Sequence, residues 1–197
     1  MQLFVSTALH MALTGPITLQ QQYSLLSRES EEVTPAGLHN GIGLLPWAPL
    51  AGGFLSGKYE RGTRPAGGTR AGSEKKLYPW TSAEYADQDR NWATIGLVKK
   101  IARQIGKTPS QVALAWLADR PSVTAPIFGA RSLAQLKENL GAADLHLDAE
   151  ATAALEKISR PTSGGYPYGH SAPRSGRGQK TAWMRCPSSL RPAAILH

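Results

Sequence analysis

Three strand-like runs alternate along the chain with segments of helical periodicity: residues 17–23, which mix apolar and polar positions, and the apolar runs 42–47 and 123–129. We predict a strand in each run. The run at 42–47 is apolar at successive rather than alternate positions, which is typical of a parallel strand that is covered on both faces. A sheet made of these runs is therefore expected to be parallel.

Helices are predicted between these runs and after the last of them. Two capping boxes, Thr81-Ser82-Ala83-Glu84 and Thr108-Pro109-Ser110-Gln111, mark the starts of two long helices. Ser132 and Asp148 are expected to cap two later ones. Four of the predicted helices span 31–40, about 109–119, 132–140 and 148–158. The fifth follows residue 81 and ends at Gly106. Its apolar stripe consists of Ile95, Val98, Ile101, Ala102 and Ile105. This alternation of strands and helices predicts an α/β fold with parallel strands.

The net charge of +8 is distributed unevenly. All 14 acidic residues lie at or before Glu156, whereas residues 160–197 hold six basic residues and no acidic one. A basic tail rich in Pro, Gly and Ser is usually disordered, so the charge does not predict nucleic-acid binding. We expect three parts: an unassigned segment 1–16, a folded domain 17–159 and a disordered tail 160–197.

A single cysteine, Cys186, excludes an internal disulfide and favours a reducing compartment. Residues 1–13 are mildly apolar but lack the basic start of a secretion signal. We therefore expect a cytoplasmic protein without a membrane partner. The five histidines (His10, His39, His146, His170 and His197) have no spacing that suits a metal site.

Two motifs each follow an apolar run. The first, at 47–59, is W-A-P-L-A-G-G-F-L-S-G-K-Y, and the second, at 129–139, is G-A-R-S-L-A-Q-L-K-E-N. Both combine glycines, backbone amides and a cation, which is the chemistry that binds phosphate. Gly52–Lys58 also matches the spacing of a P-loop, but Tyr59 stands where a magnesium-binding Ser or Thr is needed. A nucleoside-triphosphate site is thus the weaker interpretation.

The first motif resembles the segment W-S-P-L-A-x-G-x-L-x-G-K-Y of the aldo-keto reductases, although Ala48 replaces the family serine. Gln20-Gln21-Gln22-Tyr23, Pro126–Arg131 and Tyr166–Gly169 extend the resemblance over residues 17–169. The resemblance implies a partial (β/α)8 TIM barrel that comprises about the last three strands with their helices. It also implies NADP(H) as cofactor, and it points to the branch of the family that contains the potassium-channel β subunits.

The resemblance also implies roles for individual residues. Gln20 would bind the nicotinamide amide, and Trp47 would stack on the nicotinamide ring. Arg131 would pair with the 2′-phosphate, because a guanidinium can bind phosphate through two hydrogen bonds. The remaining implied cofactor-binding residues are Ala48, Pro49, Leu50, Ala51 and Gly52 with Lys58 and Arg70 around the pyrophosphate, and Gly129, Gln135, Glu138 and Asn139 around the adenosine.

The family uses a tyrosine as general acid, assisted by lysine, aspartate and histidine, to reduce carbonyl substrates. No residue of this chain can be assigned to that tetrad, so no catalytic residue is predicted. The principal hypothesis is a cofactor-binding half of an oxidoreductase that is inactive alone. The alternatives are a non-catalytic module that senses NADP(H) or pairs with itself or a companion chain, and the P-loop interpretation.

Overall fold

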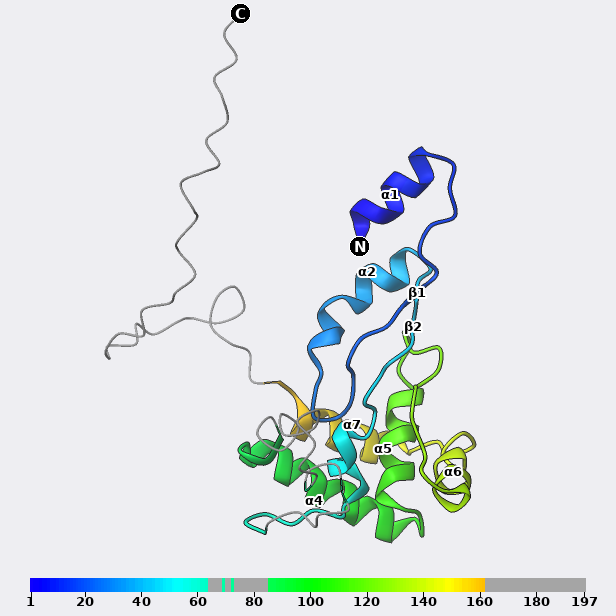
Figure 1. The fold of residues 1–197 in the computed structure, drawn as a ribbon. Coiled ribbons are helices and arrows are strands. Elements are labelled where there is room, and N and C mark those ends of the chain that lie inside the picture. The colour runs from blue at the N-terminus through cyan, green and yellow to red at the C-terminus, as the bar shows by residue number, and fades with distance from the viewer. Residues whose placement is uncertain (64–68, 70–71, 73–84, 162–197) are drawn as a thin grey trace, which may run out of the picture. The chain divides into compact units, whose positions relative to one another are not determined.

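The computed structural model describes residues 1–63, 69, 72 and 85–161, and Met1–Pro161 form one compact unit (Figure 1). The predicted cofactor residue Arg70 and the predicted capping box 81–84 lie outside the described residues. The elements, in chain order, are α1 (Gln2–His10), β1 (Thr18–Leu19), η1 (Glu29–Glu32), α2 (Thr34–His39), β2 (Gly43–Leu44), η2 (Ala51–Ser56), α4 (Asp89–Gln104), α5 (Pro109–Ala118), α6 (Leu133–Leu140) and α7 (Ala149–Ser159).

The three strand-like runs lie side by side as parallel segments. β1 pairs with β2 in the register Thr18–Gly43, and a further parallel bridge joins Leu44 to Val123. The regular strands are only two residues long, much shorter than the predicted runs. Pro46 lacks an N–H group and cannot donate to a neighbouring segment, which contributes to the short length of β2. The α/β class is confirmed, while the predicted third strand is represented by the bridge at Val123.

Local capping interactions define three of the helix starts. The Thr108 side chain accepts from the Gln111 N–H group, and the Gln111 side chain accepts from the Thr108 N–H group, which completes the predicted capping box. Ser132 and Asp148 cap α6 and α7 as predicted. Ile105 differs from the prediction: it follows the last residue of α4 and is 40% exposed, because the buried face of the helix ends before it.

A hydrophobic core forms where α4 packs against α5 and α7, with the turn η2 laid across α4 and α5. Phe54 anchors η2 in this core. Its ring centroid lies 4.7 Å from that of Tyr59, 5.7 Å from that of Tyr85 and 5.8 Å from that of Trp92. Because η2 is held by a buried aromatic cluster, the glycine-rich backbone around it has a fixed position.

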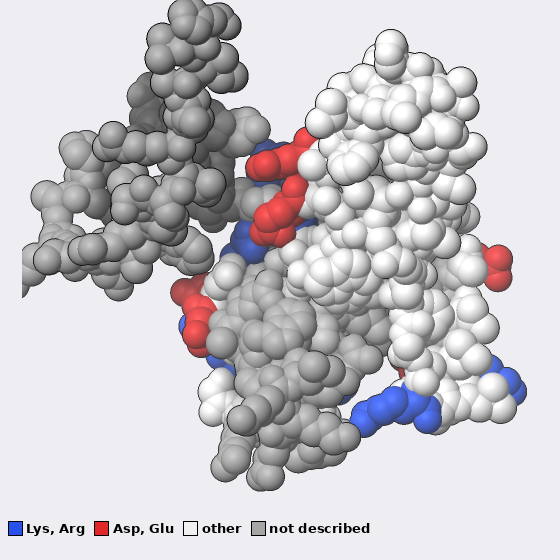
Figure 2. Space-filling model, turned by 45° about the horizontal axis from the view of Figure 1, so that its top comes forward, with Lys and Arg blue, Asp and Glu red and all other residues white. Residues whose placement is uncertain are grey.

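The N-terminal helix α1 has a different environment. None of its residues is buried, and Leu3, Phe4 and Leu9 are each more than 70% exposed. Residues 1–27 contain no Lys, Arg, Asp or Glu, and Figure 2 shows a broad uncharged area over this part of the described chain. This helix lies in the segment 1–16, to which the sequence analysis assigned no element.

Candidate functional site

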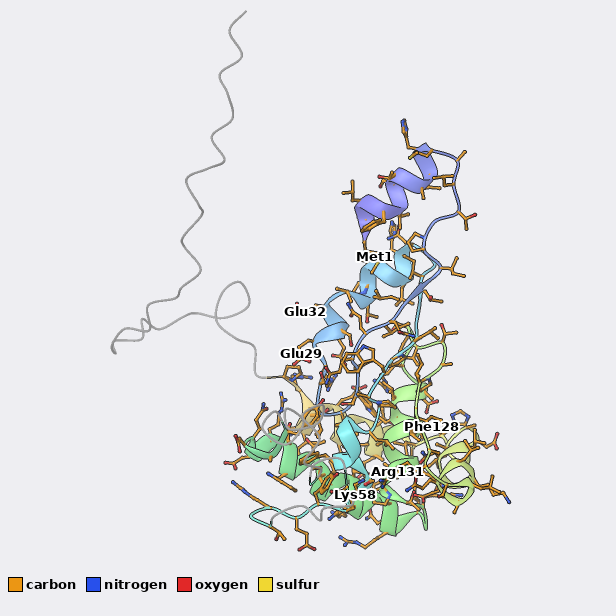
Figure 3. The ribbon with its side chains drawn as sticks, in the orientation of Figure 1. Met1, Glu29, Glu32, Lys58, Phe128 and Arg131 are labelled. Carbon is orange, nitrogen blue, oxygen red and sulfur yellow. The ribbon has the colours of Figure 1, made fainter. Side chains whose placement is uncertain are left out.

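A pocket of about 340 Å³ lies between η2, the first turn of α5 and the segment that leads into α6. Lys58, Phe128 and Arg131 mark its position in Figure 3. Its volume is within the range of small-molecule sites. The lining residues are Ala48, Pro49, Leu50, Gly52, Gly53, Ser56, Lys58, Ser110, Ile127, Phe128, Gly129, Arg131, Gln135, Glu138 and Asn139.

One wall of the pocket is a backbone turn in an unusual conformation. Four residues have positive φ: Ala48 (53°), Ala51 (48°), Gly52 (64°) and Gly53 (99°). Non-glycine residues rarely adopt this region, and strain of this kind concentrates at functional sites. The turn is closed by the Ser56 hydroxyl, which donates to the Gly53 carbonyl at 2.7 Å.

Lys58 is folded back against this turn. A β-carbon built on Gly53 would lie 2.7 Å from the Lys58 Nζ atom and 2.9 Å from its Cε atom. The Lys58 ammonium also lies 5.1 Å from the centroid of the Tyr59 ring, a distance at which a cation is attracted to the ring face. The absence of a side chain at Gly53 therefore lets the lysine bring its charge to the wall of the pocket.

The opposite wall is the start of α6. The Gln135 side chain accepts a hydrogen bond from the Arg131 backbone N–H group at 2.9 Å, while the Gln135 N–H group donates to the Ser132 hydroxyl at 3.2 Å. These bonds fix the loop from which the exposed Arg131 side chain extends. The Gln135 side chain thus bonds to Arg131, one residue before the Ser132 cap, and not to the N–H group of the cap residue itself.

The inner part of the pocket is polar but uncharged. Ser110, in the first turn of α5, is 5% exposed, and Asn139, in the last turn of α6, is 8% exposed. The two helices are joined beside them by a hydrogen bond of 2.9 Å from the Gln111 Nε2 atom to the Glu138 carbonyl. The pocket therefore has cationic side chains at its surface and two buried neutral polar residues at depth, and the half-buried Glu138 adds one acidic residue to its lining.

The structure brings together ten of the predicted cofactor residues: Ala48, Pro49, Leu50, Gly52, Lys58, Gly129, Arg131, Gln135, Glu138 and Asn139. Gln20 and Trp47 do not line this pocket. They lie on neighbouring parallel segments, where the Trp47 N–H group donates to the Gln21 carbonyl, and the Trp47 side chain is 39% exposed. Ala51 is fully buried beneath the turn rather than in the pocket.

Sequence reasoning missed five lining residues: Gly53, Ser56, Ser110, Ile127 and Phe128. Gly53 and Ser56 lie inside the first motif, and Ile127 and Phe128 lie in the third strand-like run, so their positions could have been inferred from the motifs beside them. Ser110 carried no such signal, because in the sequence it is an ordinary residue of a capping box.

A second polar cluster lies away from this pocket. Arg28 forms an ion pair with Glu31 at 2.7 Å and donates to the Glu156 carbonyl and to the Ser159 hydroxyl, each at 2.9 Å. The Tyr23 hydroxyl donates to Glu31 at 2.7 Å. Burial, together with this hydrogen bond to a carboxylate, raises the pKa of Tyr23 well above its ordinary value. The cluster links η1 to α7 and has a structural role.

The geometry defines an α/β protein with a pocket suited to an anionic ligand that also has a neutral part. The described ranges contain no cluster of His, Cys, Asp and Glu that could hold a metal ion. They also contain no helix with the length and apolar character needed to cross a membrane.

The sequence profile of the aldo/keto reductase family matches residues 5–160. The chain belongs to the aldo/keto reductase family, which confirms the resemblance seen in the motifs. The match begins twelve residues before residue 17, where the sequence resemblance started, and therefore includes most of α1.

Individual relatives agree with this assignment. The uncharacterized oxidoreductase YrpG of Bacillus subtilis (strain 168) is 34% identical over 145 residues, which are 73% of this chain and 40% of that protein. A probable voltage-gated potassium channel subunit beta of Arabidopsis thaliana is 36% identical over 135 residues, 68% of this chain and 40% of that protein. Protein tas of Escherichia coli (strain K12) is 32% identical over 143 residues, which are 72% of this chain and 39% of that protein. The chain spans about two fifths of the length of these relatives.

Proposed function

We propose that this chain is the NADP(H)-binding part of an aldo/keto reductase-type oxidoreductase, built from the last strands and helices of the family's barrel. The observation that carries the proposal is the pocket that extends from Lys58 to Arg131, with two cations beside a glycine-rich backbone turn. Phosphate groups favour this combination of cations and backbone N–H groups.

The residues present fit the two ends of the cofactor. The turn at Ala48–Gly53 with Lys58 would hold the pyrophosphate, because Gly53 leaves room for the lysine ammonium at the turn. Arg131, fixed through its backbone by Gln135, would bind the 2′-phosphate. Gln20 and Trp47, on adjacent segments outside the pocket, would contact the nicotinamide.

When bound, NADPH supplies a hydride to a carbonyl carbon. The residues of this chain bind and orient the cofactor, and the general acid of the family would have to come from elsewhere, since no residue here is assigned to it. We therefore expect the chain to bind NADPH and to reduce no carbonyl substrate by itself.

The first experiment is a titration of the purified chain with NADPH, followed by tryptophan fluorescence, with NADH in parallel. Saturable quenching that is tighter for NADPH would support the proposal. Absence of saturable quenching by either nucleotide, from a chain whose circular dichroism shows folded helices, would refute it. A carbonyl-reduction assay in the same samples separates cofactor binding from catalysis.

A second candidate function is pairing with a polypeptide that carries the remaining strands and helices of the same family. The support is the unpaired outer edge of β1, since the described sheet has the order β1-β2, together with the exposed apolar helix α1. Unpaired strand edges and apolar patches favour association, and the relatives are about two and a half times as long as the matched region.

This candidate can be tested by co-expression with the unmatched part of the YrpG protein. Co-purification that is abolished by the double substitution Leu3→Glu and Phe4→Glu would support pairing through α1. Separate elution of the two polypeptides, both folded, would refute it. An NADP(H)-sensing role would require, in addition, that NADPH changes the strength of this association.

A further inference from the structure

Ser110 is a buried residue whose hydroxyl has no hydrogen-bond partner in the described part of the chain. It is 5% exposed and lines the pocket, yet its hydroxyl makes no hydrogen bond within the described part of the chain. Its backbone N–H group, at the second position of α5, also has no acceptor there, because the Thr108 cap is used by Gln111. The Ser110 oxygen is not among the buried side-chain atoms that lack a partner, so it is open to the pocket, where a ligand can accept its hydrogen bond.

The place of Ser110 within the pocket indicates which part of a ligand it meets. The hydrogen bond between Gln111 and the Glu138 carbonyl places the first turn of α5 beside the last turn of α6, where the buried Asn139 lies. Arg131 precedes the first residue of α6. Leu133 and Asn139 are separated by about 9 Å along the helix axis, at about 1.5 Å per residue. The buried pair Ser110 and Asn139, the polar floor of the pocket, therefore lies at the end of α6 opposite to the backbone of Arg131.

The surface and the floor of the pocket also differ in the charge of their side chains. The Lys58 and Arg131 side chains belong to exposed residues, whereas Ser110 and Asn139 are buried and neutral. A phosphate dianion at the floor would lose much of its hydration without a buried cation to compensate. A flat neutral heterocycle with nitrogen acceptors is compatible with a hydroxyl donor and an amide in an otherwise enclosed site.

We infer that Ser110 is a ligand-positioning residue whose hydroxyl donates a hydrogen bond to the purine base of the bound dinucleotide, while the phosphates stay at the cationic surface. The inference rests on the proposed function, because it assigns a role within the same pocket. It adds to the family motifs a residue that none of them contains. Ser110 contributes affinity for the adenosine end and does not discriminate between NADP(H) and NAD(H).

The test uses the full chain and adenosine 2′,5′-bisphosphate, a probe that carries only the adenosine end. Calorimetry compares the wild-type chain with Ser110→Ala, and we expect binding to weaken about 5- to 10-fold, as for a lost hydrogen bond in an enclosed site. Ser110→Cys, nearly isosteric but a weak donor, should behave like Ser110→Ala. Ser122→Ala, which removes another buried hydroxyl that does not line this pocket, should bind like the wild type.

Phosphorus NMR of the bound probe identifies the contact. If Ser110 meets the base, the shifts of both bound phosphates are the same in the wild type and in Ser110→Ala. A changed phosphate shift, or an affinity within 2-fold of the wild type in a variant that keeps the wild-type thermal midpoint, would overturn the inference and leave the proposed function intact. Failure of the wild-type chain to bind the probe would instead overturn the proposed function and this inference together.

Discussion

The side chain of Lys58 occupies the space that a β-carbon on Gly53 would need, with the ammonium nitrogen 2.7 Å from that position. Gly53 also has φ of 99°. We predict that Gly53→Ala costs about 1–2 kcal/mol of stability, because a side chain disfavours positive φ. Displacement of the ammonium should in addition weaken NADPH binding about 10-fold, as for a lost charge-assisted contact.

Gly106→Ala is the matched control for this substitution. Gly106 has φ of 64°, but nothing lies within 4 Å of the position that a β-carbon would take there, so only the backbone cost should remain. Urea unfolding should give similar losses of stability for the two variants, whereas the fluorescence titration should distinguish them. Equal NADPH affinities for the two variants would contradict a role for Lys58 in binding.

Arg131 is expected to determine cofactor preference. We predict that Arg131→Gln raises the Kd for NADPH about 10- to 100-fold and leaves the Kd for NADH within about 2-fold, since the lost interaction is a charged hydrogen bond to the 2′-phosphate. Arg103→Gln, an exposed arginine in the last turn of α4, serves as the control. Equal weakening of both cofactors by Arg131→Gln would place the guanidinium at a group that the cofactors share.

Tyr23 should give the chain a measurable sensitivity to alkaline pH. Its folded-state pKa is raised by burial and by its hydrogen bond to Glu31, so the tyrosine ionises more readily in the unfolded chain, near pH 10. The contribution is constant below that pH, and stability falls as the pH rises above it. Urea unfolding at pH 8 and at pH 10.5 should show that the free energy of unfolding falls less between these pH values for Tyr23→Phe than for the wild type.

If the wild type and Tyr23→Phe lose the same amount of stability between pH 8 and pH 10.5, Tyr23 is not the source of the alkaline pH dependence. The substitution also deletes one hydrogen bond, which is expected to cost about 0.5–1.5 kcal/mol at neutral pH. Glu31 keeps its ion pair with Arg28 in the variant, so the carboxylate is not left without a partner.

Substitution of Leu155 tests how strongly the packing of α7 stabilises the rest of the unit. It is fully buried on the helix that packs against α4, and we predict that Leu155→Ala costs about 2–5 kcal/mol. Leu9→Ala, at a position on α1 that is 77% exposed, should change stability by less than about 0.5 kcal/mol. A cost below about 1 kcal/mol for Leu155→Ala, measured by urea unfolding, would show that α7 is not part of the cooperative core.

The features that could be predicted from the sequence are local. Thr108, Ser132 and Asp148 each bond to a backbone N–H group three residues later, so a cap is encoded within four residues and can be recognised there. The two motifs at 47–59 and 129–139 are equally compact, and most of the residues predicted from them line one pocket.

The features that could not be predicted depend on contacts between distant segments. Ser110 lines the same pocket as residues of α6, which begins more than twenty residues later. The helix α1 has no buried face, and without an apolar stripe its segment lacked the periodicity from which the other helices were inferred. The strand β2 is short in part because Pro46 has no N–H group to donate, and Gly43 allows Thr124 of the neighbouring segment to approach closely.

The hydrogen bond from Arg28 to Ser159 joins residues that are 131 positions apart, and it affects how the chain is made as well as how it is held. During synthesis, Arg28 cannot form its hydrogen bonds to the Glu156 carbonyl and the Ser159 hydroxyl until α7 has left the ribosome. Contacts of such long range slow folding. A nascent chain that ends before α7 therefore leaves the Arg28 guanidinium without two of its hydrogen-bond acceptors.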